Sequence, residues 1–216
     1  PYPPTTVEER PLGRVPALRV SAPAGGQGRV VLWFHGGGYC VGSPRSHLEL
    51  AAAVARRASA GAVLPAYRLA PENPFPAAVE DARAAYVALL AEDVDPARLV
   101  IGGDSSGGGL AFSLLHTLLA EGLPRPAGVV AFSPWTDLTL SGESLSTLAA
   151  RDALLPANRV AELRELYLAG ADPTDPRASP ILGRFAGAPP TLIQASADEI
   201  LRDDARGMAA RLERDG

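Results

Sequence analysis

Short apolar runs alternate along the chain with longer segments in which apolar residues recur every three or four positions. The short runs, bounded by Gly and Pro, predict buried strands, and the longer segments predict helices between them. We expect strands at 30–34, 62–66, 99–102, 127–132 and 191–194, and helices at 46–57, 76–91 and 107–120. This order predicts an α/β fold, with a mostly parallel sheet covered by helices on both faces.

Two segments depart from the alternation. Residues 145–168 have helical periodicity but interrupt the strand–helix order, so we expect a helical insertion over one end of the sheet, within 145–170. The first 29 residues are Pro-rich and weakly patterned, which predicts one edge strand at 14–21 and otherwise a surface arm. A length of 216 residues fits a single domain spanning 1–216.

The charge and residue composition of the chain exclude several classes of partner and of catalytic site. A net charge of −4 gives no electrostatic reason to expect nucleic acid or an anionic membrane as a partner. All 20 basic residues are Arg, so the chain has no lysine for a Schiff base, a phosphate-binding P-loop or a Ser–Lys dyad. The single Cys40 forms no intramolecular disulfide, and no apolar run reaches the ~18 residues of a membrane span. We expect a soluble cytoplasmic protein.

The segment from Gly103 to Gly107 has the pattern G-x-S-x-G, placed after a predicted strand and before a predicted helix. This context is typical of a nucleophile elbow, a tight turn that exposes a serine, here Ser105, at the start of a helix. A phosphate-binding glycine loop is the alternative. The missing lysine excludes a P-loop, and Asp104 stands where a dinucleotide fingerprint needs its central glycine.

A second glycine-rich segment, His35-Gly36-Gly37-Gly38, directly follows the first predicted strand. Ester and amide hydrolysis needs N–H donors aimed at the oxygen that becomes negative. Glycines let the backbone approach closely, so we predict an oxyanion hole formed by the N–H groups of Gly37, Gly38 and Ser106. His35 precedes the predicted nucleophile, and we expect it to hydrogen-bond within this loop rather than act as a base.

Taken together, these motifs resemble those of the hormone-sensitive-lipase-like bacterial carboxylesterases, a family of the α/β-hydrolase fold. The matching segments are HGGGY (35–39), YRLAPENPFPAA (67–78), GDSSGG (103–108), SPWTD (133–137) and SP (179–180). The resemblance implies hydrolysis of short to medium acyl esters through an acyl-enzyme, with neither metal nor cofactor, beneath a partly helical cap. Ser106 and Asn73 stand where the family usually has Ala and His.

The resemblance also implies an acid after the strand at 191–194, and its first Asp is Asp198. A carboxylate in the first turn of a helix is the alternative role, which Asp203 and Asp204 fill better. The triad histidine should follow, but 18 residues remain after Asp198 and none is His. Roughly 24 residues are needed to reach that position, so we expect the histidine beyond Gly216 and regard the chain as a fragment.

The other two histidines are poor substitutes for this base. His116 lies about 16 Å along a helix from Ser105, and His47, near the start of the preceding helix, is expected to pack or cap there. Because the base is absent, a non-catalytic ligand-binding protein on the same scaffold stays open. An amidase or deacetylase is the neighbouring enzymatic alternative. An exposed last strand would invite self-association, so a homodimer is the assembly we consider.

Overall fold

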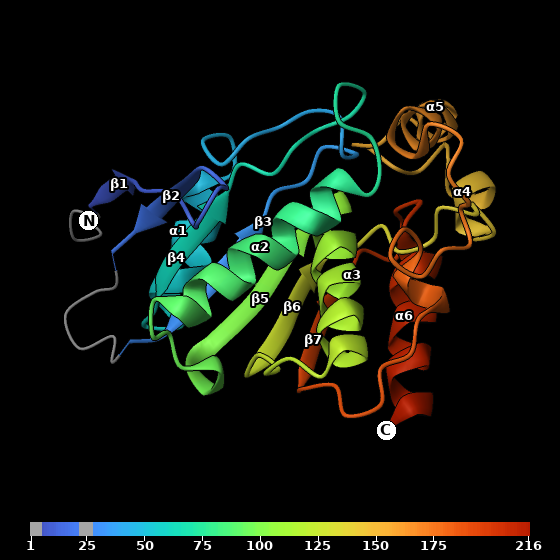
Figure 1. Cartoon of the computed structure of the whole chain (residues 1–216). Helices are drawn as coiled ribbons and strands as arrows, with labels where there is room; N and C mark the ends of the chain where they lie inside the picture. Colours follow the sequence, from blue (N-terminus) through green and yellow to red (C-terminus); the bar gives the residue numbers. More distant parts are fainter. Residues whose placement is uncertain (1–5, 22–27) are drawn as a thin grey trace.

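A computed structural model describes residues 6–21 and 28–216, and Figure 1 shows their arrangement. Within these residues seven strands form one sheet, in the order β1-β2-β4-β3-β5-β6-β7. The strands are β1 (Val7–Glu9), β2 (Ala17–Val20), β3 (Val30–Phe34), β4 (Gly61–Pro65), β5 (Leu99–Asp104), β6 (Gly128–Phe132) and β7 (Thr191–Gln194). Strands β1 and β2 are antiparallel to their neighbours, and the pairs from β4 to β7 are all parallel.

Helices cover both faces of the sheet (Figure 1). They are α1 (Leu48–Arg57), α2 (Ala77–Ala91), α3 (Ser106–Glu121), α4 (Ser144–Thr147), α5 (Ala157–Leu168) and α6 (Arg202–Asp215), with 3-10 turns η1 (Pro96–Arg98) and η2 (Pro180–Leu182). Alternate residues of β3 face opposite sides, as strand geometry requires. Val31 and Trp33 pack with α1, whereas Leu32 and Phe34 join the larger core under α2 and α3.

The predicted fold class is confirmed, and β3 and β7 have the predicted bounds. Elsewhere the ends move by one or two residues, as for α1, which begins at Leu48 instead of 46. The N-terminal prediction was partly wrong. Strand β2 lies inside the predicted edge segment, but the edge itself is formed by β1, a short exposed strand paired with β2. Residues 1–5 and 22–27 of the predicted arm lie outside the described residues.

The predicted insertion contains α5 and all of α4 but its first residue, Ser144, and an irregular stretch joins the two helices. Figure 1 shows both helices beyond the ends of the strands, on the side where β3, β5 and β6 finish. Among the described residues, no helix is long and apolar enough to cross a membrane.

Parallel pairing places the carboxyl ends of β3, β5, β6 and β7 along the same end of the sheet. Phe34 of β3 pairs with Gly103 of β5, and Asp104 pairs with Phe132 of β6, which in turn pairs with Gln194 of β7. The loops that follow these strands therefore start side by side, in the position where ligands bind to open α/β sheets.

Candidate active site

Ser105 occupies a strained turn between β5 and α3. Its backbone has φ 53° and ψ −124°, a conformation that residues other than glycine rarely adopt. Three main-chain hydrogen bonds hold it there. The Ser105 N–H donates to the Phe132 carbonyl at 2.8 Å, and the Ser105 carbonyl accepts from Gly109 at 3.0 Å and Trp135 at 2.9 Å. Strain of this kind persists only where the surroundings enforce it, and it is concentrated at functional sites.

The two flanking glycines permit this turn because the chain on either side of Ser105 is almost in contact. A Cβ atom on Gly103 would lie 2.4 Å from the backbone of Gly107. A Cβ atom on Gly107 would lie 2.1 Å from the carbonyl oxygen of Phe34. Neither obstacle is a movable side chain, so both positions require glycine. The backbone is the tight turn that the G-x-S-x-G spacing predicts.

The triple-glycine loop after β3 lies against this turn. A Cβ atom on Gly36 would be 3.2 Å from the Cβ of Ser105, and Gly37 and Gly38 follow with φ of 131° and 60°. Within the described part of the chain, the N–H groups of Gly37, Gly38 and Ser106 make no hydrogen bond. Three unpaired donors therefore gather beside one serine, as an oxyanion hole requires.

The side chain of Ser106 has a contact that the sequence does not reveal. It is fully buried, and its Oγ accepts a hydrogen bond from the Tyr39 N–H at 3.2 Å. The hydroxyl thus ties the first residue of α3 to the end of the triple-glycine loop. An alanine at this position would lack the acceptor and leave the Tyr39 amide without this partner.

His35 is a neutral structural residue. Burial lowers its pKa to about 4, against a smaller opposing effect of the hydrogen bond to Gly36. Its Nδ1–H donates to the Gly36 carbonyl at 2.8 Å, while the Tyr67 hydroxyl donates to the His35 carbonyl at 2.6 Å. The two rings stack with their centroids 4.4 Å apart. The predicted loop-shaping role of His35 agrees with these contacts.

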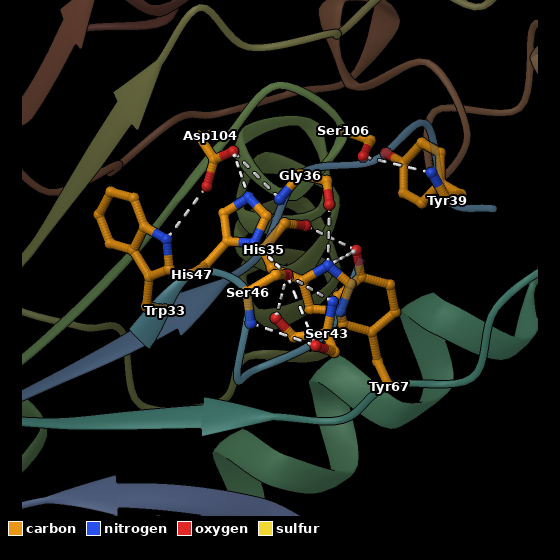
Figure 2. A network of polar contacts seen from close by, with 10 residues as sticks. All are labelled: Trp33, His35, Gly36, Tyr39, Ser43, Ser46, His47, Tyr67, Asp104 and Ser106. Carbon is orange, nitrogen blue, oxygen red and sulfur yellow. Dashed lines mark hydrogen bonds and ion pairs between the residues drawn. The ribbon is translucent and has the colours of Figure 1, made fainter. Parts of the chain in front are cut away.

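The expectation that His47 packs or caps at the start of α1 was only partly right, since its ring packs 5.5 Å from that of His35 between centroids. His47 occupies the N-cap position of α1, but its side chain makes no capping hydrogen bond. Its Nε2 lies 3.1 Å from Oδ2 of Asp104, the residue before Ser105 (Figure 2). Asp104 also accepts hydrogen bonds from Trp33 Nε1 at 3.2 Å and from the Gly36 N–H at 3.1 Å. Burial raises the pKa of Asp104, and the charge of His47 opposes this rise.

His116, the third histidine, faces away from the site. Its Nδ1 lies 3.3 Å from the backbone nitrogen and the carbonyl oxygen of Arg184. All three histidines of the chain are among the described residues, and none of them is hydrogen-bonded to Ser105. These contacts agree with the rejection of each as the general base.

Two adjacent carboxylates follow β7, and they have different surroundings. The Asp198 side chain is 52% exposed and forms an ion pair with Arg151 at 2.6 Å. Glu199 points inward: its Oε2 accepts a hydrogen bond from the Ser133 hydroxyl at 2.9 Å. Its Oε1 is buried and has no hydrogen-bond partner among the described residues. A buried carboxylate oxygen without a partner is costly, which indicates a missing donor at this point.

Helix α5 lies over the triple-glycine loop. A Cβ atom on Gly38 would meet the Leu163 side chain of α5 at 2.8 Å. The ring of Tyr167 stacks on Tyr39 at 3.9 Å between centroids, and its carbonyl accepts a hydrogen bond from the Phe75 N–H at 2.7 Å. The segment 67–78 thus connects α5 to the glycine loop, because Phe75 bonds to Tyr167 and the Tyr67 ring stacks on His35.

Comparisons with known proteins identify the fold and the family of the chain. A family model described as the alpha/beta hydrolase fold matches residues 31–216. The chain is 47% identical to an acetyl-hydrolase of Streptomyces hygroscopicus over 186 residues, which are 86% of this chain and 62% of that protein. It is 35% identical to an esterase of Acinetobacter venetianus over 211 residues, covering 96% of this chain and 69% of that protein.

A crystal structure of an esterase from the bacterial hormone-sensitive lipase family superimposes with a TM-score of 0.95 at 43% identity. The match covers 98% of this chain and 71% of that one. The chain thus spans about two thirds of the length of these relatives. On sequence, fold and the match over 31–216, it belongs to the α/β-hydrolase family, among the bacterial hormone-sensitive-lipase-like esterases.

Proposed function

We propose that this chain carries the nucleophile and oxyanion hole of a carboxylic-ester hydrolase that acts on short to medium acyl esters. The observation that carries the proposal is the strained turn at Ser105, with the unpaired N–H groups of Gly37, Gly38 and Ser106 gathered beside it. The names of the relatives, an acetyl-hydrolase and an esterase, support the same chemistry and a small acyl group.

In this mechanism the Ser105 Oγ attacks the ester carbonyl while a base removes its proton. The carbonyl oxygen becomes negative in the tetrahedral intermediate and is held by the three N–H donors. The positive end of the α3 dipole adds to their effect, because Ser106 begins that helix. The alcohol then leaves with a proton from the base, and water attacks the acyl-enzyme to release the acid.

The base in this proposal is a histidine outside the 216 residues. His35, His47 and His116 are each hydrogen-bonded elsewhere, and the relatives are longer than this chain. The carboxylate that orients such a histidine is either Asp198, as predicted, or its neighbour Glu199. The geometry favours Glu199, because its buried Oε1 lacks a partner and an imidazole N–H would supply the missing donor.

The cap in this proposal is the insertion at 145–170. Leu163 lies above Gly38, so side chains of α5 would form one wall of the acyl site. The reaction needs neither metal nor cofactor, since the oxyanion hole supplies the electrostatic stabilisation. A single domain, cytoplasmic location, absence of nucleic-acid partners and a homodimer stay predictions from the sequence.

Hydrolysis of p-nitrophenyl acetate by the natural full-length protein tests the proposal, with Ser105→Ala as the variant. We expect the variant to lose at least 99.9% of kcat while its circular dichroism spectrum stays unchanged, since a nucleophile contributes about 10⁶-fold. Ser113→Ala is a matched control, because this buried serine of α3 donates only to the Gly109 carbonyl within the same helix. Equal activity of Ser105→Ala and the wild type would exclude the assignment.

A further inference from the structure

Figure 2 shows a polar network that joins three segments far apart in the sequence. Its centre is Asp104, which ends β5 and directly precedes Ser105. Its Oδ1 accepts from Trp33 Nε1, while its Oδ2 accepts from the Gly36 N–H and lies 3.1 Å from His47 Nε2. The carboxylate therefore links the residue before the nucleophile to the first glycine of the oxyanion loop.

Only a carboxylate satisfies this arrangement. Two of the three N–H groups converge on one oxygen and the third binds the other, so both oxygens must be acceptors. An asparagine has one acceptor oxygen, and its amide would face either Trp33 or the Gly36 N–H with a donor against a donor. The side chain is about four-fifths buried, so water would not readily replace a lost partner.

His47 is itself held at both ring nitrogens. While Nε2 faces Asp104, Nδ1 lies 2.9 Å from the Ser46 hydroxyl. Ser46 is fixed in turn, because its Oγ donates to the Ser43 carbonyl at 2.8 Å and accepts from the Ser43 N–H at 2.9 Å. The imidazole of His47 is thus held in one orientation by the turn formed by residues 43–46.

We propose that His47 is a positioning residue: by holding the Asp104 carboxylate, it fixes the Gly36 amide and so places the donors of Gly37 and Gly38 relative to Ser105. This inference rests on the proposed ester hydrolase function. Without the imidazole the carboxylate keeps the N–H groups of Trp33 and Gly36, but Oδ2 loses one of its two donors and is held less firmly. The acceptor of the Gly36 N–H would then no longer be fixed in one position.

The consequence for turnover follows from the geometry of an oxyanion hole. Donors stabilise the tetrahedral oxygen only within hydrogen-bond reach, and a misplacement of about 1 Å costs about 100-fold in rate. The ester in its ground state depends less on these donors than the intermediate does. Loss of His47 should therefore lower kcat and leave KM almost unchanged.

The test measures kcat and KM for p-nitrophenyl acetate with His47→Ala and His47→Gln in the natural full-length protein. We expect His47→Ala to lower kcat 10- to 100-fold with KM within threefold of wild type. In His47→Gln the side-chain amide can place an N–H where Nε2–H stands, so we expect kcat to recover to within about fivefold of wild type. Asp104→Asn, which cannot satisfy all three donors, should lower kcat more than His47→Ala.

His116→Ala is the matched control, since it removes a histidine whose ring contacts Arg184 away from the site, and its kcat should not change. Urea unfolding of each variant reports stability separately. If His47→Ala keeps kcat within twofold, or His47→Gln is as slow as His47→Ala, the positioning role is refuted while the ester hydrolase proposal stands. If the wild type shows no Ser105-dependent turnover, the function itself is refuted and this inference with it.

Discussion

Asp204 in the first turn of α6 gives a pH-dependent stability whose sign is set by the structure. Its side chain is 2% exposed, and its Oδ2 accepts hydrogen bonds from the N–H groups of Thr136 at 2.7 Å and Asp137 at 2.8 Å. Burial raises the pKa of Asp204 to about 7, despite these hydrogen bonds. The neighbouring carboxylate of Asp137 contributes to the rise, since two like charges disfavour each other.

Asp137 remains the ionised member of this pair. Burial acts to raise its pKa, but four hydrogen bonds from the amides and hydroxyls of Ser141 and Thr139 lower it overall. The pKa of Asp204 rises from 3.8 in the unfolded chain to about 7 in the folded protein. This difference corresponds to about 4 kcal/mol of folding free energy that depends on pH. That stabilisation is fully present below pH 3.8 and is lost as the pH rises through 7.

Asp204→Asn removes the titrating group and keeps the acceptor, since one amide oxygen can receive both N–H groups. We expect the variant to gain stability relative to wild type with rising pH, by up to about 4 kcal/mol between pH 4 and pH 8.5. Urea unfolding followed by circular dichroism at several pH values measures this difference. Asp203→Asn is the control: the pKa of Asp203 is lowered, because hydrogen bonds from Ser144 and Arg202 outweigh burial.

The stability contributed by Asp203 depends on pH in the opposite sense to that of Asp204. It is present above the ordinary pKa of Asp203 and is lost as the pH falls. The penalty of Asp203→Asn should therefore be almost constant from about pH 5 to pH 8.5 and shrink only at lower pH, while Asp204→Asn improves as the pH rises. A stability difference between Asp204→Asn and wild type that stays constant from pH 4 to pH 8.5 would contradict the argument, because it would mean that Asp204 titrates alike in the folded and unfolded chain.

Two further predictions concern the nucleophile turn and the acid. Gly107→Ala should destabilise the protein by about 3 kcal/mol or more, because its Cβ meets the Phe34 carbonyl, whereas Gly122→Ala, with open space but φ 65°, should cost about 1 kcal/mol in the same urea unfolding assay. Glu199→Gln should lower kcat of the natural full-length protein at least 100-fold, and Asp198→Asn, which loses an exposed ion pair, less than threefold. The reverse ranking in ester hydrolysis would assign the acid to Asp198.

The features that the sequence predicts well are those encoded by contiguous residues. The nucleophile turn lies within 103–107 and the glycine loop within 35–38, so the order of residues in each short segment indicates its geometry. Buried strands such as β3 are equally plain, because every residue from 31 to 34 is apolar and buried. The short strand β1 is exposed throughout, so it carries no apolar signal and was missed.

The contacts that escaped prediction join residues far apart in the chain. His47 meets Asp104 only because β3 and β5 are neighbours in the sheet, and Glu199 meets Ser133 only because β6 and β7 pair. For Glu199 a local signal existed, since Asp198 and Glu199 are adjacent and both lie after the strand. Composition could not say which carboxylate turns inward, because that depends on the backbone of the loop.

The loop bearing Gly37 and Gly38 is anchored on three sides: by Asp104 at Gly36, by Ser106 at Tyr39, and by the stacked rings of His35 and Tyr67. These three anchors belong to the sheet and its flanking segments, while α5 contacts the same loop only through Leu163 and the stacked ring of Tyr167. Selection could therefore remodel the rest of the insertion for new acyl groups without disturbing the dipoles that meet the oxyanion. Separating the acyl-binding insertion from the anchored oxyanion loop in this way would let the same catalytic groups act on many different substrates.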